Sequence, residues 1–201
     1  MSEARVQQEA PDFTAQAVMP DGSFKEIKLS DSRGKYTALF FYPLDFTFVC
    51  PTELIALSEK MDEFQKRNAE VIAISVDSPY SHAAWRSASR EQGGVGDLKY
   101  PLLSDLDKSI SRQYGVLLEK PGIALRGLFL LDKEGILKHI TVNDLPLGRN
   151  IDEILRVLDA IQFNEEHGEV CPANWHKGEE GMKPDQQGLN SYSKKHYSKV
   201  A

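Results

Sequence analysis

Cysteine is scarce in this 201-residue chain, which contains only Cys50 and Cys171. The two residues lie far apart in the sequence, so they form neither a clustered zinc motif nor a disulfide framework. Cys171 and His176 could suggest a metal ligand pair, but two ligands without a second pair do not make a site, and we expect no bound metal. In a reducing compartment, widely separated cysteines are more often catalytic or redox-sensing than structural.

Basic charge and long apolar runs are also lacking. The formal net charge of −6 argues against a nucleic-acid-binding protein, which usually carries a basic face. No apolar run is long enough to cross a bilayer, and residues 1–13 lack the apolar core of a signal peptide. We therefore expect a cytoplasmic protein with no nucleic-acid partner and no membrane insertion.

The stretch that carries the strongest local signals is residues 36–53, YTALFFYPLDFTFVCPTE. Residues 36–42 form an apolar and aromatic run without helical periodicity, which predicts a strand buried on both faces. Proline is favoured at the first helical position, so Pro51 makes Cys50 the expected N-cap of a helix. Apolar residues at helical spacing then predict one amphipathic helix over residues 51–68, and they are Leu54, Leu57, Met61 and Phe64.

Cys50 is a candidate nucleophile because of this position. Free backbone N–H groups and the helix dipole stabilise an anion at a helix start, which favours the thiolate form of a cysteine. The alternative interpretation is structural, since an unpaired intracellular cysteine is most often a small buried hydrophobe.

The remaining pattern predicts an α/β fold. A β-branched apolar run at residues 70–76 follows the first helix, which indicates a βαβ unit with parallel strands. The other expected strands form two hairpins and one short strand, at residues 13–18, 24–29, 100–104, 125–131 and 136–142. The other expected helices cover residues 79–92, 107–114 and 151–167, and residues 115–122 are expected to form a loop.

A βαβ half followed by a hairpin and a covering helix is the thioredoxin-like arrangement, with a mixed central sheet flanked by helices and an added N-terminal hairpin. Beyond Gly168, glycine, proline, lysine and glutamine dominate, so a self-contained core is not expected there. We divide the chain into a thioredoxin-like domain over residues 1–165 and a C-terminal arm over residues 166–201.

Pro43, Thr47 and Cys50 form the pattern P-x-x-x-T-x-x-C. In the longer wording FYPLDFTFVCPTE, the pattern closely resembles the signature of the typical 2-Cys peroxiredoxins, and the similarity extends over about residues 10–181. The resemblance implies the same fold and a thiol peroxidase that reduces hydrogen peroxide and organic hydroperoxides in antioxidant defence and peroxide signalling. A thiolate attacks the weak O–O bond directly, so no cofactor is expected.

The resemblance also implies roles for the neighbours of Cys50. The Thr47 hydroxyl both donates and accepts, so it can hold a peroxide oxygen while bonding the sulfur, and Pro43 would shield the sulfur from water. A turn-capping threonine and a strand-terminating proline are the alternatives.

Arg126 interrupts the apolar run LRGLFLL, where a guanidinium must reach solvent or find an anionic partner. The resemblance places this arginine beside the reactive sulfur, with Glu53 orienting it and Arg149 as a second arginine of the same network. Glu53 and Arg149 can instead be an ordinary helix-start carboxylate and a surface cation.

Cys171, in VCPANW, matches the resolving cysteine of the family. The resemblance implies a disulfide between Cys50 of one chain and Cys171 of another, reduced afterwards by thioredoxin or a similar dithiol. It also implies homodimers that assemble into rings, as decamers.

Two other functions stay open at this point. A thiol–disulfide oxidoreductase on the same fold would need a second cysteine near Cys50, where Thr47 stands instead. An oligomeric chaperone or redox relay is excluded by no motif in the sequence.

Overall fold

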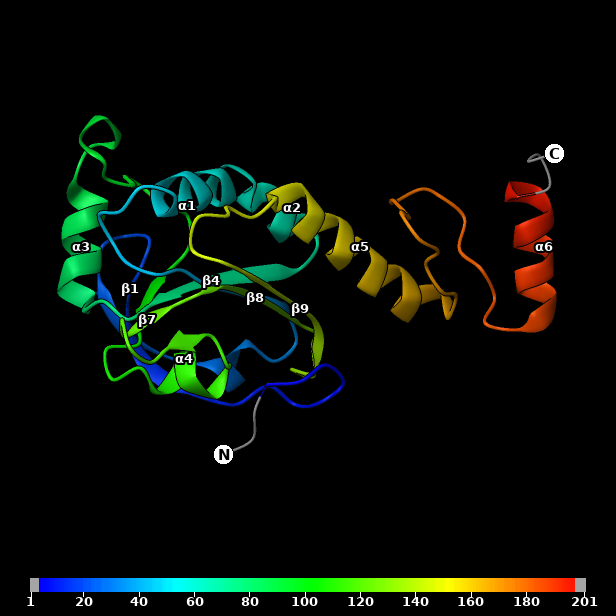
Figure 1. Ribbon diagram of the computed structural model, residues 1–201, viewed down its shortest axis with the longest axis horizontal. Coiled ribbons are helices and arrows are strands. Elements are labelled where there is room, and N and C mark those ends of the chain that lie inside the picture. Colours follow the sequence, from blue (N-terminus) through cyan, green and yellow to red (C-terminus); the bar gives the residue numbers. More distant parts are fainter. Residues whose placement is uncertain (1–3, 198–201) are drawn as a thin grey trace. The chain divides into compact units, whose positions relative to one another are not determined.

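Strand β3 (Tyr36–Phe41) is buried along its whole length, as its apolar and aromatic sequence predicts. It pairs in parallel with β4 (Ala69–Ser75) and antiparallel with β8 (Arg126–Leu131). The computed structural model describes residues 4–197, and its central sheet has seven strands in the order β2-β1-β5-β4-β3-β8-β9 (Figure 1). The outer strands are β1 (Thr14–Val18), β2 (Phe24–Lys28), β5 (Leu102–Ser104) and β9 (Leu137–Asn143). The predicted thioredoxin-like α/β fold is confirmed.

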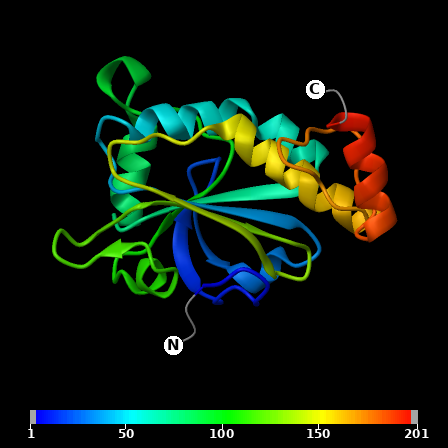
Figure 2. The same cartoon turned by 45° about the vertical axis from the view of Figure 1, so that its right-hand side comes forward.

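Helices lie on both sides of this sheet. In the two views, α1 (Cys50–Glu59) and α2 (Met61–Lys66) lie on one side and α4 (Ser109–Gln113) lies on the other (Figures 1 and 2). Next to α4, the rings of Phe41, Tyr114 and Phe129 pack with centroids 4.9–5.5 Å apart. Aromatic packing of this kind stabilises beyond the area that it buries, and it fixes the inner strands.

The predicted single helix over residues 51–68 is wrong in two details. Lys60 has a non-helical ψ of 4° and donates its N–H to Leu57 and Ser58, so the helix breaks there into α1 and α2. The apolar spacing is preserved across a one-residue turn, which is why periodicity alone does not reveal the break. At the other end, Val49 is the N-cap, and Cys50 is the first helical residue rather than the cap.

Two further boundaries differ from the prediction. Helix α3 (Pro79–Ser87), capped by Ser78 as expected, ends before residue 92 because Ala88 is extended, and a 3-10 turn (Arg90–Gln92) follows. The segment predicted as a loop at residues 115–122 contains part of a small hairpin, in which β6 (Leu117–Leu118) pairs with β7 (Ile123–Ala124). Strands of two residues are too short to show an alternating pattern.

The chain divides into two compact units, Met1–Ile151 and Asp152–Ala201, here called the N-terminal and C-terminal units. Helix α5 (Ile151–His167) begins at this division, after Asn150 as predicted. The division predicted from the sequence, into a domain over residues 1–165 and an arm over residues 166–201, stays a prediction.

In the C-terminal unit, Val170 and Met182 form an isolated antiparallel bridge, and α6 (Gln186–His196) begins at an Asp185 cap. The sequence did not predict α6, because it has few apolar residues and buries none. Among residues 4–197, no helix has the length and apolar character that a bilayer crossing requires.

Candidate active site

Cys50 lies where the carboxyl end of β3 leads, through the loop of residues 42–49, into the first turn of α1. The sheet and the helix start therefore place it at one edge of the N-terminal unit. Cys50 is a free cysteine with 1% of its surface exposed, whereas Phe48, two residues earlier, is 92% exposed. The sulfur is thus buried, although the preceding loop carries exposed side chains.

Arg126 reaches the sulfur from the neighbouring strand. Because β8 runs antiparallel to β3, its first residue lies at the edge where β3 ends. The Arg126 Nη1 atom is 3.3 Å from Cys50 Sγ, and Nε donates to the Leu145 carbonyl at 2.7 Å. Arg126 is 3% exposed, so of the two alternatives that the sequence left, solvent or an anionic partner, the structure shows the second.

Glu53 joins two arginines at this site. Its Oε2 accepts from Arg126 Nη1 at 2.8 Å, and its Oε1 accepts from both the backbone N–H and Nε of Arg149 at 2.8 Å. The Arg149 side chain is 3% exposed and stacks on the Phe40 ring, with 3.3 Å between Cζ and the ring centroid. Burial lowers the pKa of Arg149, and Glu53 opposes that shift.

These three charged groups leave a positive excess next to Cys50. Two guanidinium groups and one carboxylate sum to one uncompensated positive charge, in a place where buried charges need partners. A Cys50 thiolate supplies the missing negative charge. The site is therefore electrostatically balanced only when the sulfur is an anion.

Thr47 and Pro43 lie on the loop that precedes Cys50. Pro43 is buried and lies two residues beyond the end of β3, because the strand stops at Phe41 rather than at residue 42 as predicted. The Thr47 hydroxyl donates to the Leu44 carbonyl at 2.9 Å, and among residues 4–197 it makes no hydrogen bond to Cys50. The expected bond from Thr47 to the sulfur is therefore not formed here, although the hydroxyl oxygen keeps its acceptor sites.

Cys171 belongs to the C-terminal unit, where its Sγ lies 3.6 Å from the Ala160 carbonyl of α5. Burial raises the pKa of Cys171, and the nearby Arg156 guanidinium partly opposes this. Arg156 donates to the Trp175 carbonyl at 2.9 Å, which fixes the loop carrying the cysteine to α5. The Trp175 ring also packs against Phe163, with 4.8 Å between centroids, as expected for a packing anchor.

One buried cluster was missed by sequence reasoning. Tyr42 and Asp45, on the loop before Cys50, meet His82 of α3, with 2.8 Å between Asp45 and each of the other two. The available signal was the placement of His82 three residues before Trp85 on α3, on the helix face that packs inward.

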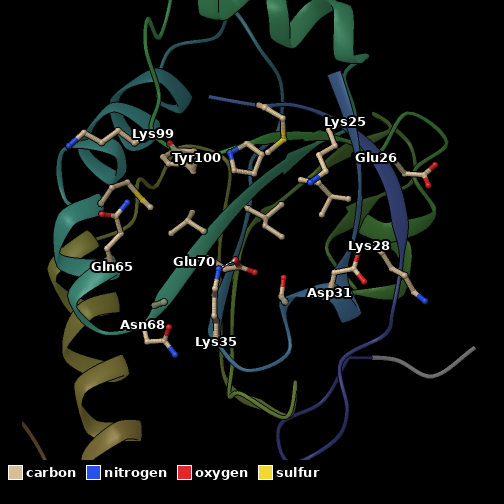
Figure 3. Close-up of a pocket in the computed structure, with 18 residues that line it drawn as sticks. Lys25, Glu26, Lys28, Asp31, Lys35, Gln65, Asn68, Glu70, Lys99 and Tyr100 are labelled. Atoms are coloured by element: carbon tan, nitrogen blue, oxygen red, sulfur yellow. Dashed lines mark hydrogen bonds and ion pairs between the residues drawn. The ribbon is translucent and has the colours of Figure 1, made fainter. Parts of the chain in front are cut away.

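A groove of about 500 Å³ lies elsewhere in the N-terminal unit (Figure 3), and none of the seven predicted site residues lines it. Two of its lysines are paired, since Lys35 lies 3.4 Å from Glu70 and Lys99 lies 3.0 Å from Asp62. Among residues 4–197, no group of three or more His, Cys, Asp or Glu side chains is arranged to hold a metal ion.

Comparisons with known proteins identify the family of the chain. Residues 6–140 match the AhpC/TSA family, and residues 160–195 match the C-terminal domain of 1-Cys peroxiredoxin. The chain is 59% identical to Peroxiredoxin-1 of Gallus gallus, over 92% of this chain and 94% of that relative. It is 57% identical to the mitochondrial Thioredoxin-dependent peroxide reductase of Drosophila melanogaster, over 98% of this chain and 84% of that relative.

A solved structure is also similar throughout. The reduced 2-Cys peroxiredoxin of Plasmodium vivax superposes with a TM-score of 0.92 at 50% identity, covering 94% of this chain and 98% of that one. The second family match is named after peroxiredoxins with one cysteine, but the matched residues of this chain include a second cysteine, Cys171. The chain therefore belongs to the AhpC/TSA family, in which it is a peroxiredoxin of the 2-Cys type.

Proposed function

We propose that this thiol peroxidase reduces hydrogen peroxide and organic hydroperoxides with Cys50 as the attacking nucleophile. The observation that supports this most directly is the 3.3 Å approach of Arg126 Nη1 to Cys50 Sγ at the first residue of α1. A helix start and a guanidinium both favour an anion on the sulfur, and the thiolate is the reactive form of a cysteine.

The first half of the reaction needs only the chain's own residues. The Cys50 thiolate attacks one oxygen of the peroxide, so an S–O bond forms while the O–O bond breaks. The departing oxygen takes a proton and leaves as water or alcohol, and Cys50 becomes a sulfenic acid. Arg126 stabilises the charge that develops on the oxygens, Thr47 orients the peroxide, and buried Pro43 keeps water from the sulfur.

Glu53 and Arg149 act indirectly in this proposal. Glu53 holds Arg126 in place through its 2.8 Å bond, and Arg149 holds Glu53 through three hydrogen bonds. The carboxylate therefore orients the guanidinium that meets the peroxide.

In the second half, Cys171 of a partner subunit attacks the sulfenic acid, which releases water and leaves a disulfide between the chains. Thioredoxin, or a similar dithiol, then reduces this disulfide. The name of the Drosophila relative supports a thioredoxin donor. The proposal includes a homodimer, and assembly of dimers into a decameric ring.

The resolving step is tested by non-reducing electrophoresis after a pulse of one equivalent of peroxide. The wild-type chain is expected to run as a covalent dimer, and Cys171→Ser is expected to run as a monomer because its sulfenic acid has no partner thiol. A wild-type chain that stays monomeric would contradict the inter-chain scheme.

The electron donor is identified by a separate experiment, which compares turnover with thioredoxin and turnover with a flavoprotein disulfide reductase.

The ionisation of Cys171 gives a pH prediction. In a Cys50→Ser variant, alkylation of Cys171 by iodoacetamide should have its pH midpoint above that of a free peptide cysteine, because burial raises the pKa of Cys171 and only the thiolate reacts. The positive charge of Arg156 lowers that pKa, so Arg156→Met should move the midpoint to still higher pH, while Arg156→Lys should not. A wild-type midpoint at or below the peptide value would contradict this prediction.

We place the reaction in the cytoplasm. Both cysteines are free thiols, which is typical of proteins in a reducing compartment. In such a compartment, widely separated cysteines are more often catalytic than part of a structural disulfide. The Drosophila relative is named as mitochondrial, so a reducing organelle is the competing location.

A further inference from the structure

The groove of Figure 3 follows a strand edge that lacks a neighbour. Strand β4 pairs with β3 from Ala69 to Ile74, but β5 lies beside it only from Ala73 onward. Residues 69–72 of β4 line the groove, and residues 25–28 of β2 form another wall. Strand β4 therefore presents an open edge to the groove, four residues or roughly 13 Å long.

Residues from both faces of β4 line this groove. Successive side chains of a strand point to opposite faces of the sheet, so those of residues 69 and 71 share one face and those of residues 70 and 72 share the other. A hollow over one face of the sheet would be lined by alternate residues, whereas all four residues line this groove. The groove thus runs along the edge of β4, where main-chain groups can be reached.

The pattern of hydrogen bonds shows which main-chain groups face the groove. The Tyr42 N–H donates to the Ile74 carbonyl at 2.9 Å, so the even-numbered residues of β4 direct their main-chain groups toward β3. In a parallel ladder the alternate residues face the other way, as the Ala73 N–H does when it donates to the Pro101 carbonyl at 3.2 Å. The N–H and C=O groups of residues 69 and 71 therefore point toward the groove.

Pro101 explains why the ladder stops. The next bond between β5 and β4 would run from the N–H of residue 101 to the Val71 carbonyl, but proline has no N–H. Ala69 and Val71 are buried, and among residues 4–197 their outward groups have no strand partner, since β5 begins only at Leu102. Buried main-chain groups rarely stay unpaired, so water or an added strand must bond them.

An unpaired cation lies over this edge. The Lys25 side chain extends from β2 toward the groove, whereas that of the neighbouring Glu26 points away (Figure 3). Within the part of the chain that the structure describes, Lys25 has no ion-pair partner, unlike Lys35 and Lys99. In a chain with a net charge of −6, this position favours a carboxylate on a binding partner.

We propose that the groove binds an extended, acidic and apolar segment of a partner protein, about four residues long, which adds as a strand to the open edge of β4. Its main chain bonds the outward groups of Ala69 and Val71. Its acidic side chain meets Lys25, and its apolar side chains bury surface against the partly buried Met19 and Ile27. The groove contains none of the predicted site residues, so this binding is independent of peroxide reduction.

The test uses the full-length protein and a blocked peptide, acetyl-VEVTV-amide, whose residues favour an extended chain. Amide hydrogen exchange, followed by mass spectrometry at millimolar peptide, should show added protection in the fragment that covers residues 69–72. Only the amides of Ala69 and Val71 should gain protection, because those of residues 70 and 72 already bond β3.

Two methylated peptides separate main-chain from side-chain recognition. Methylating the peptide nitrogens that face β4 removes donors to the open edge but keeps every side chain. Affinity should then fall at least about tenfold, because buried groups lose their partners. Methylating the alternate nitrogens, which face away from β4, should leave the affinity unchanged.

A charge exchange tests the role of Lys25. Lys25→Glu should weaken binding of acetyl-VEVTV-amide by about 3- to 10-fold, because an exposed ion pair is lost and replaced by repulsion. The peptide acetyl-VKVTV-amide should bind this variant better than it binds the wild-type chain. Lys25→Met is the matched neutral control, with an intermediate affinity for both peptides. Peroxide consumption should be the same in all three proteins.

Four results would overturn the inference. The peptide could leave exchange at residues 69–72 unchanged, the two methylated peptides could bind equally well, or the charge exchange could have no effect. Octanoate could also protect residues 69–72 as strongly as the peptide, which would identify a site for small apolar carboxylates rather than for a strand. None of these results bears on Cys50, whose role is tested separately by peroxide consumption.

Discussion

Replacing Cys50 with serine is expected to reduce peroxide turnover to background, a loss of at least about 10³-fold. A hydroxyl is far less acidic than a thiol, so the buried arginine charge cannot convert it to a useful nucleophile at neutral pH. The other cysteine does not substitute, because it lies in the C-terminal unit and burial raises the pKa of Cys171. Peroxide consumption with a thioredoxin system measures the loss.

Cys171→Ser is the matched control for this experiment. It keeps the attacking sulfur, so it should consume about one equivalent of peroxide per chain in a rapid burst and then stop. A Cys50→Ser protein with more than a tenth of wild-type turnover would exclude the proposed nucleophile. If Cys50→Ser lost turnover but still prevented aggregation of a client protein, a separate chaperone activity would be established.

Replacing Arg126 with methionine should lower the rate constant for peroxide by about 10²- to 10³-fold, the range seen when a charge-stabilising donor is removed from an active site. Methionine preserves volume but removes the group 3.3 Å from the sulfur. The remaining Glu53 and Arg149 cancel each other, so no positive excess is left for a thiolate. Cys50 alkylation should therefore slow as well. Stopped-flow measurements of both rates, peroxide reduction and alkylation, on the same sample check this.

Two variants make this prediction specific. Arg126→Lys keeps the charge but loses the forked donor geometry, so it should recover alkylation better than peroxide reduction. Glu53→Gln leaves both arginines and should keep alkylation fast while disturbing the orientation of Arg126. Because Glu53 retains Arg149, the stability lost in Arg126→Met should stay at or below the roughly 3–5 kcal/mol expected when a buried pair is broken. If Arg126→Met were alkylated at Cys50 as fast as the wild-type chain, the electrostatic argument would be contradicted.

The inner strands could be predicted from sequence because their signals were unambiguous. The run that became β3 is almost entirely apolar and aromatic, and the run that became β8 is apolar except for Arg126, for which the sequence left solvent or an anionic partner as alternatives. The positions of Cys50 and Pro51 located the start of α1 to within one residue. The positions of Glu53 and Arg149 in the site depended on the resemblance, since a helix-start carboxylate and a loop arginine are ordinary surface features.

Other features depend on contacts that a linear pattern does not contain. Asp45 and His82 are 37 residues apart on different elements, and either one alone suggests a solvated polar residue. The break at Lys60 preserved the apolar spacing, so periodicity continued through it. Helix α6 buries no residue and is polar on average, so it lacks the apolar, core-facing residues from which helices are usually predicted.

The sharing of Glu53 between two arginines has a consequence for the oxidised enzyme. In a sulfenic acid or a disulfide the sulfur of Cys50 is neutral, and the two guanidinium groups then exceed the single carboxylate by one charge in a dry environment. The arrangement that favours the thiolate therefore penalises the neutral, oxidised forms of the same sulfur. Each oxidation removes the negative charge that balances the two arginines, and each return to the thiolate restores it.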